Sequence, residues 1–265
     1  MPNIKVNDIN MYYEIHGNGY PFLLIRGLSS DVYRWPSDFV KETSQFFRVI
    51  LFDNRGAGRT DKPDIEYSIK MMAADTIGLM KLLGIERANI LGFSMGGAIA
   101  QEIAINYPER VEKLILCGAG CGGTKSVPIS NETRSVLTSN REGLSPEEAL
   151  RETLPILFPE NFIKNNEVKI EEFVKRATLA PIPPYSYRRQ LAAALAFDSY
   201  DRLKNINTPT LAISGKEDIL VPPENSEILV ENIKGAKIKL IENVGHDMFS
   251  QEPLLVAKIV LEFLR

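Results

Sequence analysis

The stretch Gly92-Phe93-Ser94-Met95-Gly96-Gly97 decides how the fold of this chain is interpreted. It matches the pattern Gly-x-Ser-x-Gly between an apolar, strand-like run (residues 89–93) and a run of small residues typical of a packed helix (98–106). In so tight a turn a side chain at either flanking position would clash, so glycine is required on both sides. Ser94 is therefore predicted to sit on a strained strand-to-helix turn with its hydroxyl exposed. A glycine-rich turn with an incidental serine is the weaker interpretation, because both flanking elements are present.

Strand and helix patterns alternate around this turn. Short continuous apolar runs at 22–25, 49–52 and 111–117 are typical of strands buried on both faces. Apolar residues at spacings of three and four predict a helix over 68–83, which Gly84 ends. Such alternation implies right-handed crossovers and a mostly parallel, doubly wound α/β sheet. The other expected elements are a hairpin at 4–6 and 11–15, a helix within 33–46, strands at 210–214 and 238–241, and helices at 222–233 and 251–264.

Residues 124–201 interrupt this alternation, because no strong strand pattern occurs in them. Three helices are expected there, at 147–154, 168–180 and 187–197, separated by prolines. The sequence therefore predicts an α/β core made of residues 1–123 and 202–265, with a helical cap, or lid, over 124–201.

The composition narrows the classes of partner. The 265 residues are 44% apolar, and 31 Lys+Arg stand against 34 Asp+Glu, a net charge of −3. That balance lacks the basic surplus of nucleic-acid-binding proteins. No apolar run is long enough to span a membrane, and residues 1–6 lack the apolar centre of a signal peptide. We expect a soluble, cytoplasmic monomer or homodimer that acts on a small molecule, with no nucleic-acid or membrane partner.

No metal or organic cofactor is expected. Cys117 and Cys121 are too few for a disulfide framework or a four-ligand zinc site, and small buried apolar side chains are their usual role. Gly118-x-Gly120-x-x-Gly123 fits a dinucleotide-binding pattern, but the polar run after it contains Pro128, so no helix opens at once. This run is interpreted as a flexible hinge of the lid.

A serine hydroxyl needs a base, and the chain contains only two histidines. His16 ends an early strand and fits surface or turn packing. His246 follows the last strand pattern and precedes the last helix pattern, which places it at the carboxyl edge of the sheet, the same edge as Ser94. His246 is therefore the candidate base.

The acid that orients this histidine is expected in Gly215-Lys216-Glu217-Asp218, which follows the strand at 210–214 at the same edge. Asp218 is the first choice, and Glu217 and Asp247 are its competitors. The order Ser94, Asp218, His246 along the chain is typical of enzymes that carry the nucleophile on this kind of turn.

At these residues the chain resembles the α/β-hydrolase superfamily, close to its small esterase and enol-lactonase-like members. The resemblance covers essentially the whole chain, and Trp35 stands where members often carry a tryptophan. It implies an α/β-hydrolase fold with an inserted helical lid. Three further segments carry the resemblance: 53–63, similar to the Asp-x-Arg-Gly-x-Gly segment of the family; 211–222, with the acid; and 245–253, with the histidine.

The resemblance also implies an oxyanion hole formed by the backbone N–H groups of Leu28 and Met95. Members usually have His-Gly after the third strand, whereas this chain has Arg26-Gly27. Because both donors are backbone groups, this change need not abolish the hole. Arg26 is expected to be a charged strut that holds the loop, with binding of a substrate carboxylate as the alternative.

These features predict a serine hydrolase, a carboxylesterase-like enzyme acting on small carboxylic esters or lactones through an acyl-enzyme on Ser94. Hydrolysis of carbon–carbon bonds and cofactor-free perhydrolysis by the same three residues remain alternatives. Dehalogenase and epoxide hydrolase chemistry is disfavoured, because such relatives carry Asp at the position of Ser94. A non-enzymatic ligand sensor on a hydrolase scaffold is the alternative from another class.

Overall fold

Eight strands form one sheet in the computed structural model, which describes residues 3–265. Met1 and Pro2, on which part of the signal-peptide interpretation falls, lie outside the described residues. The strand order is β1-β2-β4-β3-β5-β6-β7-β8; β2 runs antiparallel to β1 and β4, and every other pair is parallel, as predicted. The strands are β1 (Asn3–Val6), β2 (Ile9–His16), β3 (Tyr20–Ile25), β4 (Phe47–Phe52), β5 (Ala88–Phe93), β6 (Val111–Cys117), β7 (Thr210–Gly215) and β8 (Lys237–Ile241).

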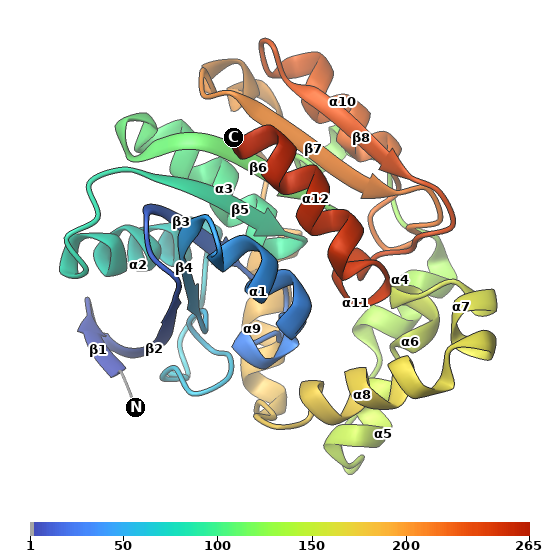
Figure 1. The fold of residues 1–265 in the computed structure, drawn as a ribbon. Coiled ribbons are helices and arrows are strands. Elements are labelled where there is room, and N and C mark those ends of the chain that lie inside the picture. Colours follow the sequence, from blue (N-terminus) through green and yellow to red (C-terminus); the bar gives the residue numbers. More distant parts are fainter. Residues whose placement is uncertain (1–2) are drawn as a thin grey trace.

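Helices cover both faces of the sheet, as Figure 1 shows. On one face, α2 (Ile69–Leu82), α3 (Met95–Asn106) and α10 (Glu224–Asn232) share one buried apolar cluster with the strands. On the other face, α1 (Ser37–Ser44) and α12 (Pro253–Leu264) contribute to a second cluster. The remaining short elements are η1 (Val32–Arg34), η2 (Pro108–Arg110), η3 (Gly123–Lys125), η4 (Tyr200–Asn205) and α11 (Met248–Gln251).

The boundaries of α2 follow from local chemistry. The Ser68 side chain caps its start by accepting a hydrogen bond from the Met71 N–H at 3.1 Å. Gly84 follows its end with φ +67°, a left-handed conformation that ends helices and that glycine adopts at no steric cost. The expected helix over 68–83 is therefore confirmed within one residue at each end.

Residues 124–201, called the insert below, lie between β6 and β7 and gather below one end of the sheet in Figure 1. They form six helices where the sequence predicted three. These are α4 (Asn131–Thr138), α5 (Pro146–Arg151), α6 (Leu154–Leu157), α7 (Glu160–Asn165), α8 (Glu167–Ala177) and α9 (Pro184–Leu195).

The predicted boundaries in the insert are wrong in three places, and proline explains two of them. The helix predicted over 147–154 ends at Arg151, and α6 starts separately with Pro155 in its first turn, where a missing N–H costs nothing. The same tolerance lets α9 begin at Pro184, three residues before the predicted start. The helix predicted over 168–180 ends at Ala177. Helices α4 and α7 were not predicted, because their polar sequences lack an apolar period.

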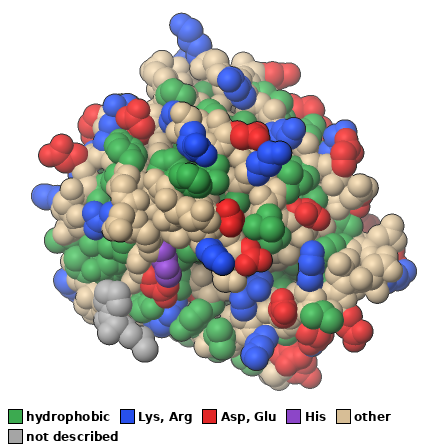
Figure 2. All heavy atoms as spheres, viewed as in Figure 1, with side chains coloured by type: hydrophobic (Ala, Val, Ile, Leu, Met, Phe, Trp, Pro, Cys, Tyr) green, Lys and Arg blue, Asp and Glu red, His purple; other side chains and the backbone are tan. Residues whose placement is uncertain are grey.

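Two features of the structure bear on the partners expected from the composition: the mixture of charges on the surface and the length of the helices. Lysine and arginine side chains are interspersed with acidic ones over the face drawn in Figure 2. Within residues 3–265, no helix has both the length and the hydropathy that crossing a bilayer requires. The cytoplasmic location and the monomeric or dimeric state stay predictions.

Candidate active site

Ser94 occupies the turn between β5 and α3, with φ 57° and ψ −124°. A non-glycine residue at positive φ stores strain on the order of 1–3 kcal/mol, so the surrounding packing has to impose it. The flanking glycines show why. A Cβ on Gly92 would lie 2.2 Å from the Gly96 carbonyl oxygen, and one on Gly96 would lie 2.2 Å from the Ile25 carbonyl oxygen. The clash predicted from the sequence is present on both sides, and Ser94 is left half-buried between fully buried neighbours.

His246 lies in the loop between β8 and α11, and its ring faces Ser94. Its Nε2 is 3.0 Å from the Ser94 Oγ, within hydrogen-bond distance. The ring is 2% exposed and packs against the Phe93 ring, with centroids 4.9 Å apart. The packing holds the imidazole in place while its Nε2 edge remains open to the hydroxyl.

Asp218 follows β7 and holds the other edge of the imidazole. Its Oδ2 is 2.8 Å from the His246 Nδ1, and because a carboxylate only accepts, Nδ1 carries the hydrogen. Its Oδ1 accepts hydrogen bonds from the backbone N–H groups of Leu220 and Val221, at 3.0 and 2.7 Å. With both oxygens engaged, the carboxylate sets the ring orientation and leaves Nε2 free to accept the serine proton.

The two competing acids lie elsewhere. Glu217 is exposed. Asp247 turns away from the imidazole: its Oδ2 is 3.3 Å from Nη2 of Arg26, and its Oδ1 caps α11 by accepting from the Ser250 N–H at 3.3 Å. The structure therefore brings Ser94, His246 and Asp218 together and leaves the other two outside.

Leu28 and Met95 lie in the two segments that pass next to Ser94. Met95 is the first residue of α3, and the N–H groups of a first helical turn have no partner within the helix. The loop after β3 passes so close that a Cβ on Gly27 would lie 2.8 Å from the Ser94 Cβ. In the part of the chain that the structure describes, neither Leu28 N nor Met95 N donates to a protein acceptor. Two N–H groups without a protein acceptor, in segments next to a nucleophile, meet one requirement of an oxyanion hole.

Gln190 is a residue of this site that the sequence analysis missed. It is fully buried on α9, where its Oε1 accepts from the Ser29 N–H at 2.8 Å and its Nε2 donates to the Arg55 carbonyl at 2.7 Å. Ser29 has φ 54°, so this bond holds a strained residue directly after Leu28. A glutamine after two arginines on α9 is a weak signal, and its partners lie more than 130 residues away in the chain.

Arg26 behaves as a buried strut. It is 1% exposed, and its guanidinium carbon lies 4.7 Å from the Trp35 ring centroid and 4.8 Å from that of Phe93. Burial lowers the pKa of Arg26, and the ion pair with Asp247 opposes that shift. Because Asp247 adjoins His246, the pair ties the loop of Leu28 to the loop of the histidine. The strut interpretation fits this geometry better than binding of a substrate carboxylate.

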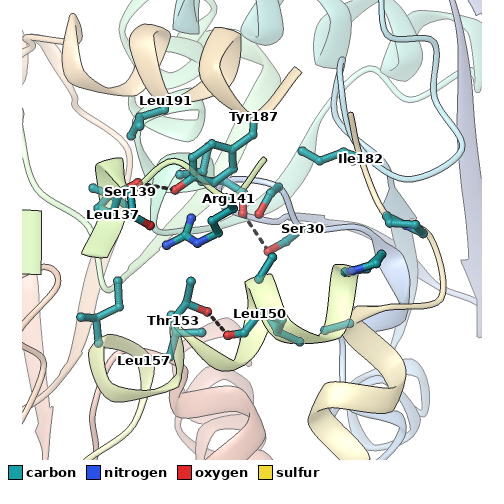
Figure 3. A pocket seen from close by; sticks show the side chains of 18 of the residues that line it. Ser30, Leu137, Ser139, Arg141, Leu150, Thr153, Leu157, Ile182, Tyr187 and Leu191 are labelled. Carbon is teal, nitrogen blue, oxygen red and sulfur yellow. Dashed lines mark hydrogen bonds between the residues drawn. The ribbon is translucent and has the colours of Figure 1, made fainter. Parts of the chain in front are cut away.

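A cavity of about 780 Å³ opens above Ser94, with its far walls built by the insert (Figure 3). This volume suits a small organic molecule. Its walls are mainly aliphatic: Leu137, Leu150, Ile156, Leu157, Leu191 and Leu220. Among residues 3–265, no group of three or more His, Cys, Asp and Glu side chains is arranged to hold a metal ion.

The signals discounted in the sequence lie outside this arrangement. His16 ends β2 on the surface, where its Nε2 is 3.0 Å from Glu14. Cys117 and Cys121 are buried and not disulfide-bonded. Only the short 3₁₀ turn η3 follows the glycine run 118–123, so no helix of a dinucleotide site opens there. The role of this run as a lid hinge stays a prediction.

The chain was compared with known proteins. A family model described as the alpha/beta hydrolase fold matches residues 20–153. The chain is 31% identical to the putative carbamate hydrolase RutD of Azorhizobium caulinodans, over 99% of this chain and 98% of that protein. A thermophilic esterase structure from Thermogutta terrifontis is similar with TM-score 0.86, 29% identity, and coverage of 100% and 98%. The meta-cleavage product hydrolase CumD from Pseudomonas fluorescens is similar with TM-score 0.85, 27% identity, and coverage of 100% and 97%.

These similarities extend beyond the sheet. The relative and both solved structures align along nearly the whole chain, so they include the insert as well as the turn at Ser94. The matched region of the family model contains β3 to α3, the segment that presents the serine and its neighbouring loop. By sequence, topology and the construction of its serine turn, the chain belongs to the α/β-hydrolase fold family.

Proposed function

We propose that the protein is a serine hydrolase that cleaves small carboxylic esters or lactones through an acyl-enzyme. The observation that carries this proposal is the continuous chain of contacts from Asp218 through His246 to Ser94, at 2.8 and 3.0 Å. A serine on a strained turn, a histidine acceptor within reach and a buried carboxylate behind it satisfy the geometric requirements of nucleophilic catalysis. Similarity to a solved esterase supports the same reaction class.

In the first half of the proposed reaction, His246 Nε2 takes the proton from Ser94 Oγ while the oxygen attacks the substrate carbonyl. The N–H groups of Leu28 and Met95 bind the oxyanion of the tetrahedral intermediate; one such donor is typically worth about 2.7–4 kcal/mol. The carbon–oxygen bond to the alcohol then breaks, and His246 returns its proton to the departing oxygen. Asp218 stabilises the imidazolium between these two transfers.

In the second half, a water molecule replaces the alcohol. His246 removes a proton from the water, which attacks the acyl carbonyl, and Ser94 leaves as its alkoxide and regains a proton from the imidazolium. The products are the free acid and the unchanged enzyme. We propose that residues 124–201 act as a cap whose aliphatic walls exclude bulk water, which strengthens each of these electrostatic interactions.

The test is turnover of 4-nitrophenyl butyrate together with labelling by a fluorophosphonate probe. We expect Ser94→Ala to lower kcat by at least about 10³-fold and to abolish labelling, since the nucleophile is lost. Ser139→Ala is the matched control, because Ser139 also lines the cavity but its hydroxyl bonds to the Val136 carbonyl. Unchanged turnover in Ser94→Ala would overturn the proposal. Absence of both turnover and labelling in the natural protein would favour a ligand sensor.

Hydrolysis of a carbon–carbon bond is the second candidate, favoured by the similarity to the meta-cleavage product hydrolase CumD. The same three residues would serve it, since His246 can deliver a proton to carbon as it does to oxygen. Loss of absorbance of a vinylogous diketone, measured beside release of 4-nitrophenol from esters, separates the two reactions. A kcat/KM at least tenfold higher for the diketone would favour the second candidate.

A further inference from the structure

The cavity above Ser94 carries more positive than negative charge in its wall. Four arginines line it, against two acids, Glu142 and Asp247. Asp247 is already paired with Arg26, and Glu142 is exposed. Of the other three arginines, Arg188 is exposed to solvent, Arg141 has only the half-exposed Glu152 as an acidic neighbour, and Arg34 is half-buried. Beside apolar side chains, a cation without a fully buried partner is costly, because burial removes hydration without replacing it.

Arg141 is the cation most directly presented to the cavity. It stands in the loop between α4 and α5, and Figure 3 shows its guanidinium pointing into the space between α9 and the helices α5 and α6. One of its N–H groups bonds to the Val136 carbonyl. The Nε lies 3.4 Å from Glu152 Oε2 without good hydrogen-bond alignment, and the Glu152 side chain is half exposed. Several of the five guanidinium N–H donors therefore remain available.

Arg34 is a second cation in the lining of the cavity. It ends η1, directly after the loop of Leu28, and its guanidinium carbon lies 5.2 Å from the Phe173 ring centroid. Within residues 3–265 no acidic side chain lies within 4 Å of it. Burial, followed by repulsion from Arg26, lowers the pKa of Arg34 to about 10, so it stays charged at neutral pH.

We propose that the preferred substrate carries a second, ionised acid group, and that Arg141 binds this group while the scissile carbonyl lies at Ser94. This inference rests on the proposed function and narrows it to half-esters or lactones of dicarboxylic acids. A guanidinium recognises a carboxylate through two parallel N–H bonds, and the aliphatic walls suit the methylenes between the two ends. The anion would add a second partner to a cation whose acidic neighbour, Glu152, is half exposed.

The test compares two esters of the same shape. Mono-4-nitrophenyl glutarate carries a carboxylate, and 4-nitrophenyl 5-oxohexanoate replaces one carboxylate oxygen with a methyl group. We expect the natural protein to favour the glutarate by about tenfold or more in kcat/KM, since a charge-assisted bond is worth about 1.5–3 kcal/mol. Release measured with Ser94→Ala is subtracted, because the free carboxylate also attacks its own ester.

Three variants locate the effect. Arg141→Met should reduce the glutarate preference by about tenfold or more while leaving hydrolysis of the oxohexanoate within about threefold. Arg141→Lys should keep part of the preference, since it keeps the charge but not the paired donors. Arg189→Met is the matched control: Arg189 also belongs to the insert, but it does not line the cavity and lies 3.2 Å from Asp64. Equal preference in the natural protein and Arg141→Met would overturn the inference.

A binding measurement separates this inference from the proposed function. Calorimetric titration of Ser94→Ala with monomethyl glutarate, and with methyl 5-oxohexanoate as the neutral control, needs no turnover. Tighter binding of the anion that disappears in the double variant with Arg141→Met supports the arginine site even if aryl esters are not cleaved. Turnover of both esters with no difference in binding supports the hydrolase alone and overturns the inference.

Discussion

The sheet region (residues 3–123 and 202–265) and the insert contribute to one cavity but are stabilised differently. The sheet region buries two large apolar clusters, and it supplies Ser94, Asp218 and His246 from three strand ends. The insert has one small cluster of its own, which consists of Leu150, Leu154, Phe158, Ile170, Phe173 and Val174. The groups that would perform the chemistry stand on the rigid part, and those that would select the substrate stand on the part with fewer buried contacts.

Helix α9 is the exception within the insert, because it is bonded to the backbone of the sheet region. Ser186 donates to the Gly56 carbonyl and Tyr185 to the Lys62 carbonyl, both at 2.7 Å, and Gln190 spans Ser29 and Arg55. Helices α5 to α8 pack mainly through the small apolar cluster. We therefore expect substitutions in the sheet region to change the catalytic rate. Substitutions in α4 to α8 should instead change substrate choice and local stability.

The largest expected effect comes from the sheet region. Asp218→Asn should lower kcat by about 10⁴-fold, because an amide can donate to Nδ1 and favours the wrong tautomer of His246. Ester turnover measures the rate, and thermal unfolding checks that the fold is retained. The control is Asp247→Asn, which should mainly weaken the bond to Arg26. A near-natural rate in Asp218→Asn would overturn this assignment and make Glu217 or Asp247, also in the sheet region, the acid.

The second effect concerns the insert alone. Phe173 is 1% exposed and packs edge-on against Phe158, with ring centroids 5.0 Å apart. Phe173→Ala should cost about 3–5 kcal/mol, and the loss should fall on α5 to α8. Hydrogen exchange should then speed up in those helices and stay unchanged in β5 and β6. Ile170→Val, expected to cost about 0.5–1.5 kcal/mol, is the milder comparison. Equal acceleration throughout the sheet would show that both regions unfold as one unit.

The third effect tests the bond between the two regions. Gln190→Met keeps the side-chain length but leaves the Ser29 N–H and the Arg55 carbonyl without their partner, which typically costs about 1–3 kcal/mol. We expect kcat to fall about tenfold with a smaller change in KM, since Gln190 positions the loop of Leu28 and need not touch the substrate. Raised KM with unchanged kcat would instead assign Gln190 to substrate binding.

The smallest effect depends on pH. Burial, followed by repulsion from Asp53, raises the pKa of Asp31 from 3.8 to about 6. The folded protein therefore holds this proton more tightly than the unfolded chain, so its stability should fall as pH rises from about 4 through 6. Asp31→Asn should remove that fall and stabilise the protein at pH 8 by up to about 3 kcal/mol, since one pKa unit corresponds to about 1.4 kcal/mol.

Asparagine can still accept the Tyr33 N–H bond that Asp31 accepts at 2.9 Å, so the cap of η1 should survive this change. Unfolding measured at about pH 3.5, below the unfolded pKa, should differ little between the natural protein and Asp31→Asn. A variant that is less stable at pH 8 would show that the carboxylate is needed in its charged form.

Much of the sheet region could be predicted because its signals are local. Buried strands are continuous apolar runs, α2 shows a helical period between a serine cap and Gly84, and the turn at Ser94 needs glycines that are adjacent in sequence. The choice of Asp218 over its neighbours also followed from position after a strand. The insert was predicted less well, since α4 and α7 are short, polar and defined by packing, and α6 begins at a proline that looked like a break.

The sequence by itself determined the mostly parallel sheet, and it predicted the insert and the serine, histidine and aspartate that the structure brings together, because turn chemistry and hydrophobic period act over a few residues. Only the tertiary structure decided what depends on distant partners. It turned Asp247 toward Arg26, placed Gln190 against Ser29, and aimed Arg141 into an aliphatic cavity. Such contacts join residues up to 221 positions apart, and no local sequence pattern predicts which buried polar groups will bond to one another.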